Sequence, residues 1–340
     1  MKKLPIGIHS FFEIIEDDYL YIDKTKEAYE LLSAYKYVFL SRPRRFGKSL
    51  FLTTLQSIFE GKKELFKGLY IYDKYDFESY PVIRIHWGGN FTSEFNFQSE
   101  VQSALGWNAE CLGVELDKTV SLSAYHQYGN ICGYTQADLE TTFRPYMEGV
   151  DMEKVKRWYD GYNFLKDNVY NPFDILNFCA TGHLYKNYWF ETGSPSFLLK
   201  LIQEKNYYVP QLENVVVDEE QLGAFDIERI NFEGLLYQSG YLTIDRVFNV
   251  GSRTMYELKI PNLEVKASFS DKIFNMLTDA FQGGISIQNN AYIALTNGDG
   301  DGVKDALYAL FASLPYQNYV NNNIFDKEAR NISNFVWEAF

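Results

Sequence analysis

The sequence predicts an α/β fold in the first part of the chain, then a helical region, then a module of helices around a β-hairpin. Three observations lead to this prediction. Strand-like and helix-like segments alternate as far as about residue 135, helical patterns dominate from residue 136, and two alternating strands follow a helix that ends near Gly240. Alternating strands and helices are typical of a layered domain built on a parallel sheet.

The composition is that of a folded protein. Of the 340 residues, 46% are apolar and 17% are aromatic, which suffices for a core and excludes global disorder. The 45 acidic and 32 basic residues give a net charge of −13, which argues against an evenly basic, nucleic-acid-coating surface. The overall charge does not exclude a local basic patch.

The cysteines indicate no disulfide or metal site, and the apolar runs indicate no membrane-spanning segment. Because Cys111, Cys132 and Cys179 are widely spaced and form no CxxC pair, we expect small buried side chains and neither disulfides nor a zinc site. Polar residues interrupt the N-terminal stretch, and no apolar run is long enough to span a membrane. We therefore expect a cytoplasmic protein without a membrane partner.

The first part is predicted to begin with a short strand at residues 19–25, YLYIDKT, that leads into a helix. The apolar face of this helix is expected to hold Ala28, Leu31, Leu32 and Tyr35. The apolar run YVFL at residues 37–40 suits a buried strand. Residues 80–88, YPVIRIHWG, have the pattern of a further strand.

The turn after the strand at residues 37–40 holds the main functional motif. In a P-loop, G-x-x-x-x-G-K-[ST], backbone N–H groups wrap the phosphates, the lysine neutralises their oxygens and the hydroxyl binds Mg²⁺. Here the window runs from Arg42 to Ser49, RPRRFGKS, with Arg42 in place of the first glycine. Gly47, which must let the backbone approach a phosphate, is present.

This loop supplies the candidate site residues for ATP, with Ser49 holding Mg²⁺ through the nucleotide. They are Arg44, Arg45, Phe46, Gly47, Lys48 and Ser49. A bare GKS is common, so its weight comes from the preceding strand and from a following helix with an apolar face of Phe51, Leu52, Leu55, Ile58 and Phe59. The alternatives are that Lys48 is a solvated residue at a helix start and that the two arginines are merely exposed.

From residue 136 onward the patterns are helical, and further helices are expected to begin at Pro172 and Pro195. A helix ending near Gly240, two strands joined around residues 249–252 and a helix after Pro261 have the order of a winged-helix domain.

Several motifs together resemble a known family. In chain order they are LPIGIHSFFEIIEDDYLYIDKT, SRPRRFGKSLFL, NICGYTQADLE, WYDGYNF, VYNPFDILNF, YWFETGSPSFLLKLI and LLYQSGYLTI. They resemble the AAA-ATPase-like family of bacterial proteins, in which this part often precedes a PD-(D/E)XK nuclease-like domain. The RPRRFGK[ST] block is the most specific part, and family members also have an arginine where the first P-loop glycine would stand.

The resemblance implies a P-loop NTPase-like parallel sheet, a helical lid and a winged-helix-like module. We therefore predict four parts: a P-loop ATPase-like α/β domain (1–135), a helical lid (136–213), a winged-helix-like module (214–285) and a C-terminal helical segment (286–340).

The sequence departs from the family pattern in two places. Family members carry a Walker B strand, ending in Asp-Glu, between two segments that meet here near Thr119, so we expect an internally shortened chain and an incomplete sheet. The chain also ends at NISNFVWEAF, near where the nuclease-like domain would begin. Because the Walker B acid holds the Mg²⁺ shell and its neighbour orients the attacking water, we expect ATP binding without hydrolysis.

Two other interpretations stay open. One is a non-catalytic protein with a vestigial P-loop, which binds a protein or nucleic-acid partner through the winged-helix-like module. The other is an active ATPase in which Asp218 and Glu219, at the end of NVVVDEE, replace Walker B. Nucleotide-dependent stabilisation and phosphate release distinguish these interpretations.

Three further patterns have simpler explanations. Residues 297–308, NGDGDGVKDALY, match much of an EF-hand loop but have Tyr308 where a bidentate Glu is required, so we expect a polar turn that opens a helix. The histidines, of which His86 is one, lack metal-binding spacing. The aromatic residues of WYDGYNF and YKNYWF could stack on bases, but we expect core packing.

Overall fold

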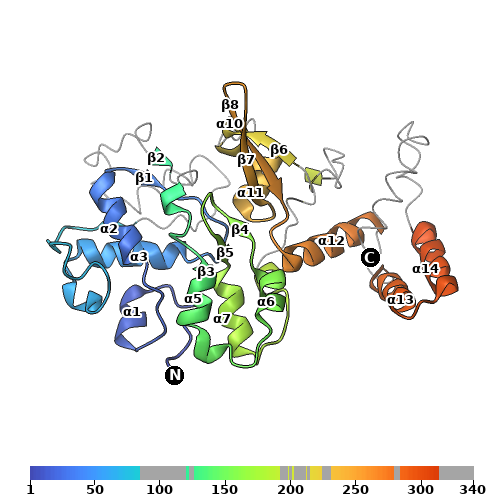
Figure 1. Cartoon of the computed structure of the whole chain (residues 1–340), viewed down its shortest axis with the longest axis horizontal. Coiled ribbons are helices and arrows are strands. Elements are labelled where there is room, and N and C mark those ends of the chain that lie inside the picture. The colour runs from blue at the N-terminus through green and yellow to red at the C-terminus, as the bar shows by residue number, and fades with distance from the viewer. Residues whose placement is uncertain are drawn as a thin grey trace, which may run out of the picture. The chain divides into compact units, whose positions relative to one another are not determined.

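The computed structural model describes residues 1–84, 120–121, 126–191, 198, 201–202, 212, 215–223, 231–278 and 284–313 (Figure 1). The chain forms two compact units. The first comprises Met1–Glu148 and Phe164–Ala180, and the second comprises Gly149–Asn163 and Thr181–Phe340. The predicted mixed α/β character is confirmed, whereas the division into four parts stays a prediction.

The first unit is mainly helical around an aromatic core. Its elements are α1 (Phe11–Glu16), α2 (Thr25–Ala34), β1 (Val38–Phe39), α3 (Lys48–Phe59), η1 (Lys63–Phe66), β2 (Val120–Ser121), η5 (His126–Tyr128), β3 (Tyr134–Thr135), α5 (Gln136–Thr141), η6 (Arg144–Tyr146), β5 (Asn168–Tyr170) and α7 (Pro172–Ala180). Phe11 of α1 is fully buried and stacks on Phe66, with 4.7 Å between the ring centroids. Its backbone N–H donates to the Thr53 hydroxyl, which joins α1 to α3.

The start of α2 differs from the prediction of a strand at residues 19–25. The structure has one isolated bridge there, between Lys3 and Tyr19. The Asp23 carboxylate accepts hydrogen bonds from the backbone N–H and the hydroxyl of Thr25, and so turns the chain into α2. The helix itself is as predicted, with Ala28 and Leu31 buried.

The strand before the loop is short and partly exposed. β1 pairs in parallel with β2, Val38 opposite Val120 and Phe39 opposite Ser121. Val38 and Phe39 are 37% and 39% exposed, so the prediction of a buried strand is wrong. Strands inside a parallel sheet are covered on both faces. A two-residue pair does not make the predicted P-loop-like parallel sheet, and the incomplete sheet stays a prediction.

The remaining elements of the first unit follow local capping signals. Thr135 and Asp138 form a reciprocal capping box at the start of α5. Pro172 begins α7 as predicted. β3 pairs antiparallel with β5. The expected strand at residues 80–88 is not formed over residues 80–84, and its remainder lies outside the described residues.

The second unit contains a three-stranded antiparallel sheet. Its elements are α6 (Met152–Tyr159), β4 (Tyr162–Asn163), α8 (Tyr188–Glu191), β6 (Val215–Asp218), α10 (Glu219–Gly223), α11 (Phe232–Ser239), β7 (Thr243–Val250), β8 (Arg253–Lys259), α12 (Leu263–Thr278), α13 (Gly284–Thr296) and α14 (Gly300–Ser313). The strand order is β6-β8-β7, and Figure 1 shows α10 and α11 beside this sheet.

The predicted order of helix, hairpin and helix is confirmed. α11 ends at Gly240, whose φ of 91° is in the left-handed region, and the two strands of the hairpin are joined at residues 251–252. α12 follows Pro261 and is capped by Asn262, whose side chain accepts from the Val265 N–H. Assignment of this region to a winged-helix module stays a prediction.

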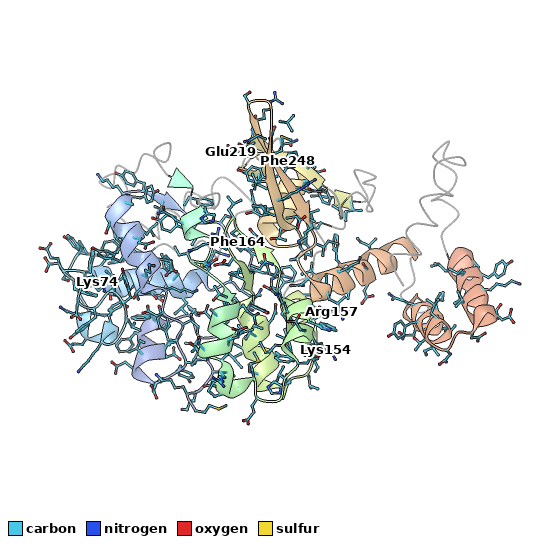
Figure 2. All side chains as sticks on the ribbon, viewed as in Figure 1. Lys74, Lys154, Arg157, Phe164, Glu219 and Phe248 are labelled. Atoms are coloured by element: carbon cyan, nitrogen blue, oxygen red, sulfur yellow. The ribbon has the colours of Figure 1, made fainter. Side chains whose placement is uncertain are left out.

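The interpretation of NVVVDEE as Walker B is wrong. β6 pairs antiparallel with β8, with Asp218 opposite Met255, so it is not a parallel neighbour of β1. The Asp218 carboxylate accepts from the Gln221 N–H and thereby opens α10. Figure 2 shows Glu219 on the same part of the chain, near the hairpin that carries Phe248.

The simpler explanations of the EF-hand-like pattern and of the aromatic residues are supported. The Asp299 carboxylate accepts from the Gly302 N–H and α14 begins at Gly300, so residues 300–308 are helical and not an EF-hand loop. Tyr159 and Tyr162 of WYDGYNF are fully buried, as is Trp189 of YKNYWF. In the part of the chain that the structure describes, no His, Cys, Asp or Glu cluster suits a metal ion.

Two findings concern the cysteines and the helices. Cys132 is buried, Cys179 is half-buried, and both are free thiols. None of the described helices combines the length and the apolar character needed to cross a membrane. Cys111, His86, Pro195 and Thr119 lie outside the described residues.

Candidate functional site

The loop between β1 and α3 ends at Gly47. Gly47 is the N-cap of α3, with φ 85° and ψ 10°, a left-handed conformation that favours glycine. A Cβ built on Gly47 would meet no atom within 4 Å, so the space beside its backbone is open. No side chain caps α3, and its first turn contains no acidic residue. The first N–H groups of the helix are therefore suited to an anion.

Lys48 points back onto its own loop. Its Nζ donates to the main-chain carbonyl oxygens of Arg42, at 2.6 Å, and of Pro43, at 2.8 Å. Burial lowers the pKa of Lys48, and the nearby guanidinium of Arg42 lowers it further. The ammonium is thus held by two neutral oxygens that an anionic ligand could replace.

Arg42 is turned into the protein. The side chain is 3% exposed, and its Nη2 donates to the Tyr128 carbonyl oxygen at 3.0 Å. Its Cζ lies 4.2 Å from the centroid of the Phe164 ring. Phe46 is also buried and meets Phe164 edge to face, with 5.8 Å between centroids. The sequence predicts that Phe164 packs in the core, but not that Phe164 and Tyr128 contact this loop, because a motif shows spacing along the chain and not which distant segments fold against it.

The other predicted residues lie on the outer part of the loop. Arg45 is exposed, has a φ of 66°, and places its guanidinium 4.9 Å from the centroid of the Phe173 ring. Arg44 is half-buried, and Ser49 is exposed in the first turn of α3. The loop thus brings all six candidate residues together, while their role toward a nucleotide stays a proposal.

A small cavity adjoins the loop within the first unit. It has a volume of about 60 Å³, and Gly47, Phe46 and Phe51 form part of its wall. The rest of its wall comes from the N-terminal segment, which includes Lys24, from α3, from the segment around Cys132 and from Pro172. Ligand pockets usually have about 300 Å³ or more. The cavity is therefore smaller than an ordinary ligand pocket.

Cys132 lines this cavity and is buried, as the sequence predicts. Burial raises the pKa of the thiol, although the positive charges of Arg42 and Lys48 act in the opposite direction. A buried thiol with a raised pKa is a poor nucleophile at neutral pH. We therefore assign Cys132 to packing beside the loop.

An acid in the Walker B position is not found in the described part of the site. The described neighbour of β1 is β2, and no acidic residue occurs in the sequence between Ser121 and Asp138. Asp138 itself receives the Thr135 N–H in the capping box of α5. The strand described beside β1 therefore supplies no acid.

Comparison with known proteins gives two matches. A family model described as AAA-ATPase_like, Predicted AAA-ATPase, matches residues 5–149. An "Uncharacterized protein in vnfD 5'region" of Azotobacter chroococcum mcd 1 is 32% identical over 412 residues, which covers 95% of this chain and 80% of that protein. No solved structure matches.

Proposed function

The chain belongs to the family of predicted AAA-ATPases, and we propose that it binds ATP with Mg²⁺ at the loop from Arg42 to Ser49. The observation that carries this proposal is the geometry at Gly47. A left-handed glycine, a lysine and a serine stand at the uncapped N-terminus of a twelve-residue helix, with open space beside the glycine.

Each group of the loop has a defined task in this proposal. The N–H groups at the start of α3 receive phosphate oxygens, and Lys48 exchanges the carbonyl oxygens of Arg42 and Pro43 for those of the phosphates. The exposed hydroxyl of Ser49 holds the Mg²⁺ that accompanies the nucleotide. Arg44 and Arg45 add positive charge at the outer side of the loop.

We further propose that binding is not followed by efficient hydrolysis. The described neighbour of the loop strand provides no acid, and Asp218 lies in a different, antiparallel sheet. The match to the Azotobacter protein extends over 412 residues, more than this chain contains, which supports the proposal of an internally shortened chain. A missing preorganised catalytic group typically lowers the rate by about a hundredfold or more.

Thermal unfolding with and without Mg-ATP tests the binding proposal. A ligand that binds only the folded state stabilises it by about 2.7 kcal/mol at a hundredfold excess over Kd. We expect a rise in Tm for the wild type and none for Lys48→Ala. Lys67→Ala, which removes an exposed lysine after η1, is the matched control and should respond like the wild type. An equal rise in Lys48→Ala would place the nucleotide elsewhere.

Phosphate release tests the second part. We expect release near background in the wild type, with no further change in Asp218→Asn, because that carboxylate caps α10. Multiple turnovers that Lys48→Ala abolishes would contradict the proposal and require an acid outside the described residues.

A second candidate function is partner binding through the β6-β8-β7 sheet. Valine side chains are exposed on it: Val216 by 46%, Val247 by 44% and Val250 by 59%. The strand register puts Val216 and Val250 on one face of the sheet and Val247 on the other, so Val216 and Val250 are the side chains offered to a protein or nucleic-acid partner. An intact protein that shows no Tm response to any nucleotide would favour this function and a vestigial P-loop.

A further inference from the structure

Arg42 occupies the position of the first P-loop glycine, and its side chain is anchored in three ways. Nη2 donates to the Tyr128 carbonyl oxygen at 3.0 Å, and Nη1 donates to the Ser41 carbonyl oxygen at 2.7 Å. The flat guanidinium also faces the Phe164 ring at 4.2 Å. A planar fork that donates in its plane and stacks on an aromatic face is particular to arginine, and lysine cannot reproduce it.

The anchor points themselves are tightly packed. A Cβ on Gly129 would lie 2.5 Å from the Lys166 Cβ and 2.7 Å from the Phe164 carbonyl oxygen, so the two segments are in close contact. Phe46, four residues after Arg42, packs on the same Phe164 ring. Phe164 is labelled in Figure 2, and it begins the second stretch of chain in the first unit. The loop therefore contacts Phe164 at two points, through Arg42 and through Phe46.

The main chain of Arg42 serves a different group from its side chain. Its carbonyl oxygen, together with that of Pro43, accepts the hydrogen bonds of the Lys48 ammonium. The direction of these two carbonyls depends on the backbone of residues 42 and 43, which the buried guanidinium holds in place. The Arg42 carbonyl oxygen thus bonds the Lys48 ammonium directly, while the guanidinium contacts other groups.

We propose that Arg42 is a positioning residue, clamped between Tyr128 and Phe164, that fixes the loop backbone so that its carbonyls hold Lys48 ready for a phosphate. The part of this proposal that concerns nucleotide binding rests on the proposed function. A direct phosphate contact by Arg42 would require the guanidinium to leave Tyr128, Ser41 and Phe164. In this proposal Lys48 and the N-terminus of α3 bind the phosphate, and Arg42 fixes the conformation of the loop.

Two variants weaken the clamp in different ways. Arg42→Lys keeps the charge but loses the planar fork, and Phe164→Leu keeps the Arg42 hydrogen bonds but removes the ring. Arg246→Lys is the matched control, because Arg246 also faces a phenylalanine, Phe248 at 5.3 Å, but lies in the second unit. Two readouts are measured on the full chain: Mg-ATP affinity, and the rate at which an amine-acylating reagent modifies Lys48 relative to Lys67 without nucleotide.

We expect each clamp variant to weaken Mg-ATP binding about tenfold and to speed Lys48 acylation several-fold. The double variant should resemble the more affected single variant, because both changes break one interaction. Arg246→Lys should match the wild type in both readouts. The proposal is overturned if Lys48 acylation is unchanged in Arg42→Lys and Phe164→Leu, or if the wild type binds Mg-ATP and both variants bind it equally tightly.

The two readouts separate this inference from the proposed function. If the wild type binds no nucleotide, the proposed function fails, yet faster Lys48 acylation in the variants would still support the clamp and an unchanged rate would overturn it. If Arg42→Lys does not fold, Phe164→Leu decides alone, since it leaves the hydrogen bond to Tyr128 in place.

Discussion

The strand pair beside the loop and the sheet of the second unit differ in the length of their pairing and in the burial of their side chains. β1 and β2 pair over two residues, and both β1 side chains are more than a third exposed. β8 pairs along its length with β6 and β7, and its Leu258 is fully buried between Val215 and Ile244. The loop at Gly47 nevertheless has a defined shape. That loop is held by side-chain contacts, above all those of Arg42. The described part of the sheet beside it is too small to hold it.

The largest effect is expected where the second sheet is buried. Leu258→Ala removes a fully buried side chain and should lower the free energy of unfolding by about 2–5 kcal/mol. Val38→Ala in β1 should cost less than about 1 kcal/mol, because that side chain is 37% exposed. Urea unfolding of both variants measures the difference. Equal losses would mean that β1 is as well covered as β8.

A smaller effect is expected where α3 is joined to α1. The Thr53 hydroxyl accepts from the Phe11 N–H and donates to the His9 carbonyl oxygen. Thr53→Val leaves the buried Phe11 N–H unpaired and removes the hydrogen bond to the His9 carbonyl oxygen, so we expect a loss of about 1–3 kcal/mol. Thr141→Val, whose hydroxyl bonds one carbonyl at the surface, is the control and should change stability by less than about 0.5 kcal/mol. Similar losses in the two variants would show that Thr53 does not join the helices.

The smallest effect concerns a buried acid in the second unit. Burial raises the pKa of Asp160, while the Gly161 N–H and the charges of Lys156 and Lys259 oppose the shift. Because the folded pKa lies above the unfolded value, this carboxyl destabilises the fold at neutral pH, and the penalty disappears as pH falls below its ordinary value. Asp160→Asn should therefore stabilise the protein at pH 7 and not at pH 3. A gain of equal size at both pH values would exclude ionisation as its cause.

The sequence is informative where a local signal decides the structure. The glycine that begins α3, the proline that begins α7 and the glycine that ends α11 each act through their own backbone, and each prediction is correct. Burial depends on distant partners and is less predictable. Leu52 was expected on the apolar face of α3 but is 49% exposed. Thr53 and Thr54 are buried there because their hydroxyls bond carbonyl oxygens.

The candidate site shows the same division. The motif identifies Gly47, Lys48 and Ser49, because phosphate binding needs these residue types at this spacing. It does not show that Arg42 points inward, since that depends on Tyr128 and Phe164, which come from other segments. The motif also does not show whether an acid lies near the loop, because that depends on which strand lies beside β1.

Hydrogen exchange of the backbone amides, measured with and without Mg-ATP, shows directly whether the loop at Gly47 binds nucleotide. We expect nucleotide to slow exchange at residues 44–49, where the N–H groups of the loop and of the α3 N-terminus receive phosphate, and to leave exchange in β7 and β8 unchanged. We also expect Lys48→Ala to lose this protection. Unchanged exchange across residues 44–49 at saturating Mg-ATP, or protection confined to the hairpin, would contradict nucleotide binding at this loop.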